Sequence, residues 1–189
     1  MTEPDWSSCS ERELWFFVAV ELQKRGIATV LVGGAAAAVH SKGAYRSGDI
    51  DLLIDAFPAP SEKALRDAML EIGFEAKGRH FRHPKCDHLF VEFIRNSLHI
   101  GKDYQIEPQT WAVDSMLVRG ISATDSVKDR LTSYVYFEAR ECLDQAALIA
   151  AVNEIDWASV EKWAVREGEA MLKAVAEVRT LANDSGSSQ

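Results

Sequence analysis

The hydrophobic pattern of the first third of the chain predicts one helix followed by two short strands, the first of them buried. Ser10 and Glu13 have the spacing of a capping box, and they precede an amphipathic stretch that ends at Gly26. The apolar run 27–32 is short and bounded by turn residues, as is typical of a buried strand, and residues 49–55 are the second expected strand. We therefore expect this region to alternate between helix and strand.

A turn with two glycines ends the first of these strands. Gly33 and Gly34 are followed by the small residues 35–38, which we expect to begin a short helix, and by a polar loop that leads to the second strand. Glycine turns of this kind occur where the backbone must approach a ligand closely.

The rest of the pattern predicts a change of class near residue 122. Up to that point we expect a helix over 61–72, strands over 74–77 and 89–94, and unplaced short strands and turns over 97–121. Beyond it the periodicity is helical throughout, with expected helices over 125–137, 143–152 and 157–181. Thr124, Asp125 and Asp156 are the cap candidates.

These elements predict an α+β fold: a small mixed β-sheet core packed with helices, followed by a C-terminal helical lobe. We assign residues 1–121 to the core with its N-terminal helix and 122–182 to the lobe, and we expect 183–189 to be a disordered tail. No internal repeat is visible.

Composition narrows the functional classes. The 189 residues carry a formal net charge of −8, so long-range attraction to nucleic acid is not indicated, and a phosphate-bearing substrate would need metal ions or a few placed cations. The three cysteines are few and widely spaced, which favours a reducing compartment over a disulfide framework. With no signal-like or membrane-spanning stretch, the sequence predicts a cytoplasmic protein without a membrane partner.

Two carboxylates of the second strand are the strongest candidates for chemistry. Side chains alternate along a strand, so Asp49 and Asp51 share one face, where they repel each other unless a cation lies between them. Mg²⁺ (or Mn²⁺) suits such oxygen ligands. Glu92 is the only charged residue inside the apolar run 89–94, and a buried carboxylate needs a partner or a metal. The alternatives are solubilising aspartates and an edge-strand glutamate facing water.

A second cluster lies in a single loop. The stretch His80–His88 contains three histidines and Cys86 within nine residues. Such a cluster could bind zinc, although structural zinc sites usually join distant segments with paired spacings, and a polar surface loop is the alternative.

The order of motifs resembles the nucleotidyltransferase superfamily that includes DNA polymerase beta. The resemblance rests on the turn Val32–Gly34, the D-x-D strand Asp49–Leu52 and the later acidic strand Val91–Phe93. In the helical part, 125–131 together with Asp144 is similar to the lysine-bearing helix of bacterial AbiEii-type nucleotidyltransferases, which are toxin components.

This resemblance implies two-metal transfer of a nucleoside monophosphate from an NTP to an RNA, protein or small-molecule acceptor. Asp49 and Asp51 would hold both metals. Glu92 would complete one metal site and take the proton of the attacking hydroxyl. Backbone N–H groups of Gly33–Gly34 and the ammonium of Lys128 would contact phosphates.

Two departures and two open candidates accompany the resemblance. The turn has Gly-Gly where many relatives have Gly-Ser, and the third carboxylate is Glu where Asp is usual. Arg46 and Ser47, directly before the D-x-D strand, are candidates for phosphate contact, with ordinary loop polarity as the alternative. The competing functions are a toxin subunit held by an antitoxin-like partner, and an inactive nucleotide-binding or scaffolding module of the same fold.

Overall fold

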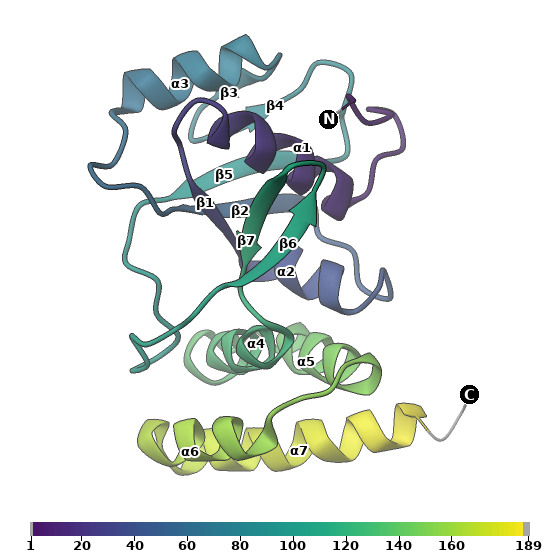
Figure 1. The fold of residues 1–189 in the computed structure, drawn as a ribbon. Helices are drawn as coiled ribbons and strands as arrows, with labels where there is room; N and C mark the ends of the chain where they lie inside the picture. Colours follow the sequence, from purple (N-terminus) through teal and green to yellow (C-terminus); the bar gives the residue numbers. More distant parts are fainter. Residues whose placement is uncertain (1, 187–189) are drawn as a thin grey trace. The chain divides into compact units, whose positions relative to one another are not determined.

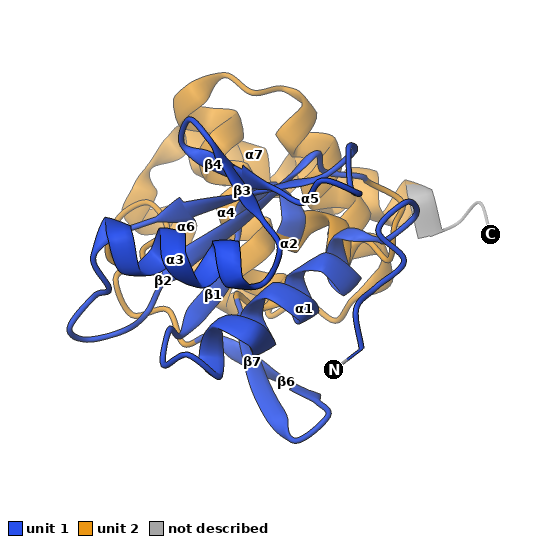
Figure 2. Ribbon diagram, turned by 90° about the horizontal axis from the view of Figure 1, so that it is seen from above, with its two compact units in different colours: residues 1–35, 46–96, 108–120 blue, residues 36–45, 97–107, 121–189 orange. Residues whose placement is uncertain are grey.

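A computed structural model of the protein describes residues 2–186 and divides the chain into two compact units. Unit 1 comprises residues 1–35, 46–96 and 108–120, and unit 2 comprises 36–45, 97–107 and the chain from 121 onward (Figure 2). The final segment of unit 2 thus begins beside the boundary expected from the sequence, whereas two short segments from the expected core also belong to unit 2.

Unit 1 is built on a mixed sheet with the strand order β3-β4-β5-β2-β1-β7-β6. The strands are β1 (Thr29–Val32), β2 (Asp49–Ile54), β3 (Glu75–Lys77), β4 (His80–Arg82), β5 (Phe90–Ile94), β6 (Gln109–Val113) and β7 (Met116–Gly120). Strand β2 is central: it pairs antiparallel with β1 and parallel with β5. The expected α+β class with a mixed sheet is confirmed.

Two helices of unit 1, α1 (Glu11–Gln23) and α3 (Glu62–Glu71), cover one face of this sheet (Figures 1 and 2). The predicted capping box of α1 is confirmed, since the Ser10 side chain accepts from the Glu13 N–H and the Glu13 side chain accepts from the Ser10 N–H. On the strands, Ile50 and Val91 are completely buried. Burial of these alternate positions leaves the intervening side chains of β2 and β5 on the opposite face.

The region that the sequence pattern left unplaced contains a hairpin. Strands β6 and β7 pair antiparallel with Val113 opposite Met116, and Asp114 in the turn has a φ of 52°. Aspartate tolerates this left-handed conformation better than most residues, which suits a two-residue hairpin turn.

Unit 2 is helical, with α4 (Ala123–Phe137), α5 (Glu141–Val152), α6 (Trp157–Glu167) and α7 (Glu169–Gly186) (Figure 1). The remaining helix, α2 (Gly33–His40), begins in unit 1 and continues into unit 2. Ser122 caps α4 by accepting from the Asp125 N–H, so the expected cap at Thr124 or Asp125 is wrong by two or three residues. The core of unit 2 is apolar and includes Val127, Leu131, Ala146, Ile149, Val160, Trp163 and Val178.

The single long C-terminal helix expected from the sequence is two helices. Gly168 separates α6 from α7 with φ 121° and ψ −177°, a backbone conformation that is essentially restricted to glycine. Helix α7 then runs to Gly186, which includes four residues of the expected tail, while 187–189 lie outside the described residues. Among the described helices, none combines the length and the apolarity needed to cross a membrane.

Candidate active site

The sheet brings three carboxylates of unit 1 together on one face. In the parallel pairing of β2 with β5, Asp51 is the register partner of Glu92, and Asp49 lies two residues earlier on β2. Neighbouring strands are about 4.8 Å apart, and paired residues project from the same face. All three side chains are partly buried. Two hydrogen-bonded strands therefore place the three carboxylates side by side on one face, although their oxygens do not all lie within 4.8 Å of one another.

The glycine turn lies directly against this cluster. Gly33 has a φ of +67°, and a Cβ atom built on it would lie 2.4 Å from Oδ2 of Asp51. The antiparallel register of β1 with β2 explains the contact, because Val32 is the partner of Asp51. Gly33 is therefore required both by its backbone conformation and by the space it leaves for a carboxylate. Gly34 follows as the second residue of α2.

Glu11 holds the loop that enters β2. Its buried carboxylate accepts a hydrogen bond from the Ser47 N–H (2.8 Å) and one from Nε of Arg46 (2.9 Å). The Ser47 hydroxyl in turn donates to Oδ1 of Asp49 at 2.7 Å. In this structure Ser47 thus contacts the first carboxylate directly, whereas Arg46 contacts Glu11. The sequence pattern did not single out Glu11, because a glutamate in the first turn of a helix is ordinary.

Strand β4 adds side chains beside Glu92 that sequence reasoning missed. His80 is the register partner of Glu92, and its Nδ1 lies 3.7 Å from Glu92 Oε1. The rings of His80 and Phe90 are 4.8 Å apart, and the Arg82 guanidinium lies 4.7 Å from the Phe90 ring centroid. Residues 80–82 were expected to be part of a loop. The alternation of side chains along a strand therefore could not be used to place His80 beside Glu92.

Lys128 belongs to unit 2, where it is buried within the helices. Its ammonium donates to Oδ1 of Asp125 at 3.1 Å and to Oγ of Ser159 at 3.0 Å. The second contact connects α4 to α6. The lysine thus pairs with Asp125 within its own helix, as a surface lysine could, but it is buried and also bonds a second helix.

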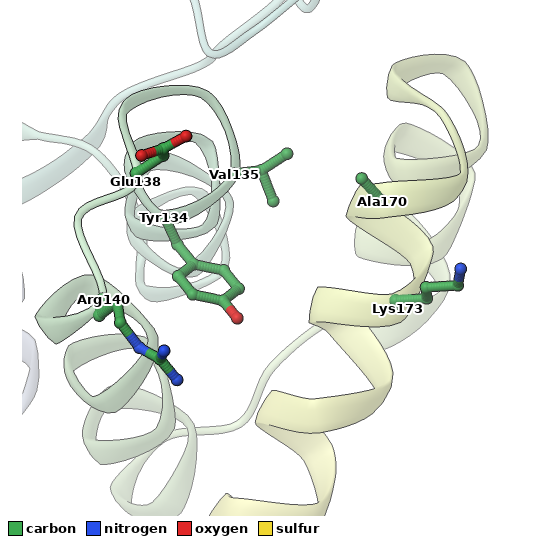
Figure 3. A pocket seen from close by; sticks show the side chains of 6 residues that line it. All are labelled: Tyr134, Val135, Glu138, Arg140, Ala170 and Lys173. Carbon is green, nitrogen blue, oxygen red and sulfur yellow. The ribbon is translucent and has the colours of Figure 1, made fainter.

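Unit 2 also has an open hollow of about 530 Å³. Figure 3 shows Tyr134 and Val135 of α4 facing α7, which contributes Ala170 and Lys173. Glu138 and Arg140, which lie between α4 and α5, complete the lining. The charged residues of the lining have both signs, and the lining contains no group of carboxylates like that of unit 1.

A cysteine–histidine cluster occupies another part of unit 1. Cys9, Cys86 and His88 place their sulfur and Nδ1 or Nε2 atoms within 4.8 Å of one another. The pKa of the Cys9 thiol is raised to about 12, mainly because the thiol is buried and secondly because Cys86 lies beside it. The surface-loop interpretation of residues 80–88 holds only in part, since 83–88 form a loop, whereas His80–Arg82 forms β4 and both His83 and Cys86 are buried. Cys9 joins from 77 positions away, which no local pattern reveals.

At the level of sequence, no protein-family model matches the chain, and no curated protein matches it. The fold, in contrast, has solved counterparts. An antigenic nucleotidyltransferase-like protein from Paracoccidioides brasiliensis matches with a TM-score of 0.66 and 16% identity, over 96% of this chain and 92% of that one.

A second solved structure is the antibiotic-resistance factor ANT(2'')-Ia. It matches with a TM-score of 0.48 and 12% identity over 95% of this chain and 94% of that one, a similarity too low to support an inference. The first match suffices for the fold. The chain has a nucleotidyltransferase-like α+β fold.

Proposed function

We propose that this protein is a metal-dependent nucleotidyltransferase that moves a nucleoside monophosphate from an NTP to a hydroxyl-bearing acceptor. The observation that carries the proposal is the register pairing of Asp51 with Glu92, which sets a third carboxylate beside the D-x-D pair. The nucleotidyltransferase-like fold supports the same activity.

The donor set fits Mg²⁺ or Mn²⁺. Asp49, Asp51 and Glu92 supply only oxygen ligands, from adjacent strands, in positions that are neither fully buried nor fully exposed. Hard divalent cations take such carboxylates together with substrate phosphates and water. When bound, the ions would neutralise the triphosphate and the entering and leaving oxygens. This role is needed in a chain with a net charge of −8.

In the proposed reaction the acceptor oxygen forms a bond to the α-phosphorus as the bond from that phosphorus to the α–β bridging oxygen breaks. Pyrophosphate leaves with the electron pair of the broken bond. Glu92 takes the acceptor's hydroxyl proton, because its carboxylate lies beside Asp51 on the neighbouring strand. Asp49 is oriented for its role by the Ser47 hydroxyl, and backbone N–H groups at Gly33–Gly34 would bind phosphate oxygens.

Three versions of this proposal differ in the class of acceptor and in the biological role. A toxin-like enzyme would modify a cellular RNA or protein and would be restrained by an antitoxin-like partner, as the AbiEii-type resemblance implies. A small-molecule transferase would use the same chemistry on a metabolite. An inactive nucleotide-binding module would bind NTP without transferring any group.

The discriminating experiment uses two labelled forms of each NTP. The protein is incubated with Mg²⁺, cell extract, and NTP carrying ³²P at either the α or the γ position. Label from the α position should enter an acceptor, and label from the γ position should appear only in pyrophosphate. Transfer of the γ label would contradict the proposal in favour of kinase chemistry. NTP binding with no transfer would support the inactive module.

The matched control in this experiment is Asp67→Asn, which removes an exposed carboxylate from α3. It should transfer label as the wild type does, whereas Asp51→Asn should not. Fractionating the labelled material into RNA, protein and metabolites then identifies the acceptor class.

A further inference from the structure

Cys9, Cys86 and His88 form a cluster that the proposed transfer reaction does not use. The sulfurs of Cys9 and Cys86 are 3.9 Å apart, and the Cys86 sulfur is 3.8 Å from Nδ1 of His88. Both thiols are free and 2% exposed. The three residues come from two segments of unit 1: the stretch before α1 and the stretch between β4 and β5.

The spacing matches the edges of a metal coordination tetrahedron. With Zn–S about 2.3 Å and Zn–N about 2.05 Å, tetrahedral angles give about 3.8 Å between two sulfurs and about 3.6 Å between sulfur and nitrogen. A disulfide would require the sulfurs to lie about 2.05 Å apart. Both measured separations are therefore close to those of a metal site, and the sulfur separation is far from that of a disulfide.

The orientation of His88 adds an independent observation. Its Nε2 lies 2.9 Å from the backbone carbonyl oxygen of Cys9, and because a carbonyl only accepts, Nε2 carries the proton. In the neutral ring Nδ1 then has the free lone pair, and this is the nitrogen that faces the Cys86 sulfur. Metal-binding histidines are commonly fixed in this way, with the second ring nitrogen donating to a carbonyl.

We propose that Cys9 Sγ, Cys86 Sγ and His88 Nδ1 bind one Zn²⁺, with a water molecule as the fourth ligand. The His88 side chain is 32% exposed, which gives the ion and the water access from solvent; Asp87 Oδ1 also lies on this side, 3.7 Å from Nδ1. Binding converts two thiols to thiolates and releases two protons per zinc, so the two thiolate charges balance the charge of the ion.

The site would stabilise the elements that position the carboxylates. Cys9 directly precedes Ser10, the cap of α1, and Glu11 in the first turn of α1 holds the loop that enters β2. Cys86 and His88 lie four and two residues before the start of β5, which carries Glu92. A zinc ion here would connect the start of α1 to the start of β5. This role is structural, so zinc binding can be tested without measuring nucleotide transfer.

The test is metal content together with cobalt spectroscopy on the full chain, purified under reducing conditions. We expect about one zinc per chain in the wild type. Replacement by Co²⁺ should give a thiolate-to-cobalt charge-transfer band and the intense visible bands of a tetrahedral site. A zinc-selective chelator, added with excess Mg²⁺, should lower the melting temperature.

Variants separate this site from chance binding and from the carboxylate cluster. Cys86→Ser and His88→Ala should lose the zinc, whereas Cys142→Ser, which changes a buried free cysteine of α5, should retain it. Asp51→Asn should also retain it. If a variant does not fold, the cobalt spectrum of the wild type still decides. A wild type without zinc and without the thiolate–cobalt band, or zinc retained equally by all variants, would overturn the proposal. So would a Cys9–Cys86 disulfide in the reduced preparation.

Discussion

Gly33 leaves the space that the Asp51 carboxylate occupies: a Cβ atom on Gly33 would lie 2.4 Å from Oδ2 of Asp51. Asp51 lies on β2, and Gly33 directly follows β1, the strand that pairs antiparallel with β2. The contact therefore joins residues that are distant in the sequence. It links the glycine turn to the carboxylate cluster by packing rather than by sequence proximity, and it can be tested by adding one methyl group.

Gly33→Ala should reduce stability and displace Asp51. The positive φ of Gly33 costs a non-glycine residue about 1–3 kcal/mol, and the clash adds to this cost. Gly26→Ala is the matched control, because Gly26 has a φ of +76° but nothing within 4 Å of its Cβ position. Urea unfolding and Mn²⁺ titration of both variants measure the two effects. Equal Mn²⁺ binding by both would mean that the methyl group does not disturb the cluster.

Asp51→Asn should remove most of the stabilisation given by Mg²⁺ or Mn²⁺. A ligand that binds only the folded state adds about 2.7 kcal/mol of stability when present at 100 times its dissociation constant. The metal also offsets repulsion among the neighbouring carboxylates, so the wild type should gain more than the variant. Thermal unfolding with and without Mn²⁺ checks this, with Asp67→Asn as control. If Mn²⁺ stabilises Asp51→Asn as much as the wild type, the metal does not bind at this carboxylate cluster.

Lys128→Ala should weaken NTP binding if this lysine contacts the triphosphate, as the sequence resemblance implies. Its loss should also lower stability, because the ammonium bonds Asp125 and Ser159. Ser159→Ala removes one of these bonds and keeps the charge, so it should lower stability without weakening NTP binding. Lys162→Ala, at an exposed position of α6, should change neither. Equal NTP affinity in the wild type and Lys128→Ala would assign this lysine a structural role alone.

Stability should fall as the pH drops through about 6.5. Burial lowers the pKa of His40 and of His83 below the usual value of 6.5. The unfolded chain therefore binds protons at a pH where the folded chain does not, so the contribution is fully present above the unfolded pKa and is lost below it. His40→Gln should flatten this dependence, and His99→Gln, at an exposed position, should not. Urea unfolding across this range provides the measurement.

Local signals in the sequence determined the elements that depend on neighbouring residues. The capping box at Ser10 and Glu13 satisfies backbone donors within one turn, so its spacing predicted the start of α1. The alternation of side chains along a strand is also local, so it predicted that Asp49 and Asp51 share one face of β2. The Gly168 break was missed because strong helix formers flank it on both sides, and periodicity alone does not reveal the φ of a glycine.

Tertiary structure alone decided which of these elements meet. The register that pairs Asp51 with Glu92 joins residues 41 positions apart (92 − 51), and it follows from how β5 packs beside β2. Glu11 reaches Ser47, and Cys9 reaches Cys86, by the same kind of long-range packing. Periodicity and capping are encoded over a few residues, whereas strand order and register depend on the burial of the whole apolar surface. The sequence by itself thus determined the candidate carboxylates, and only the folded sheet brought the third beside the first two.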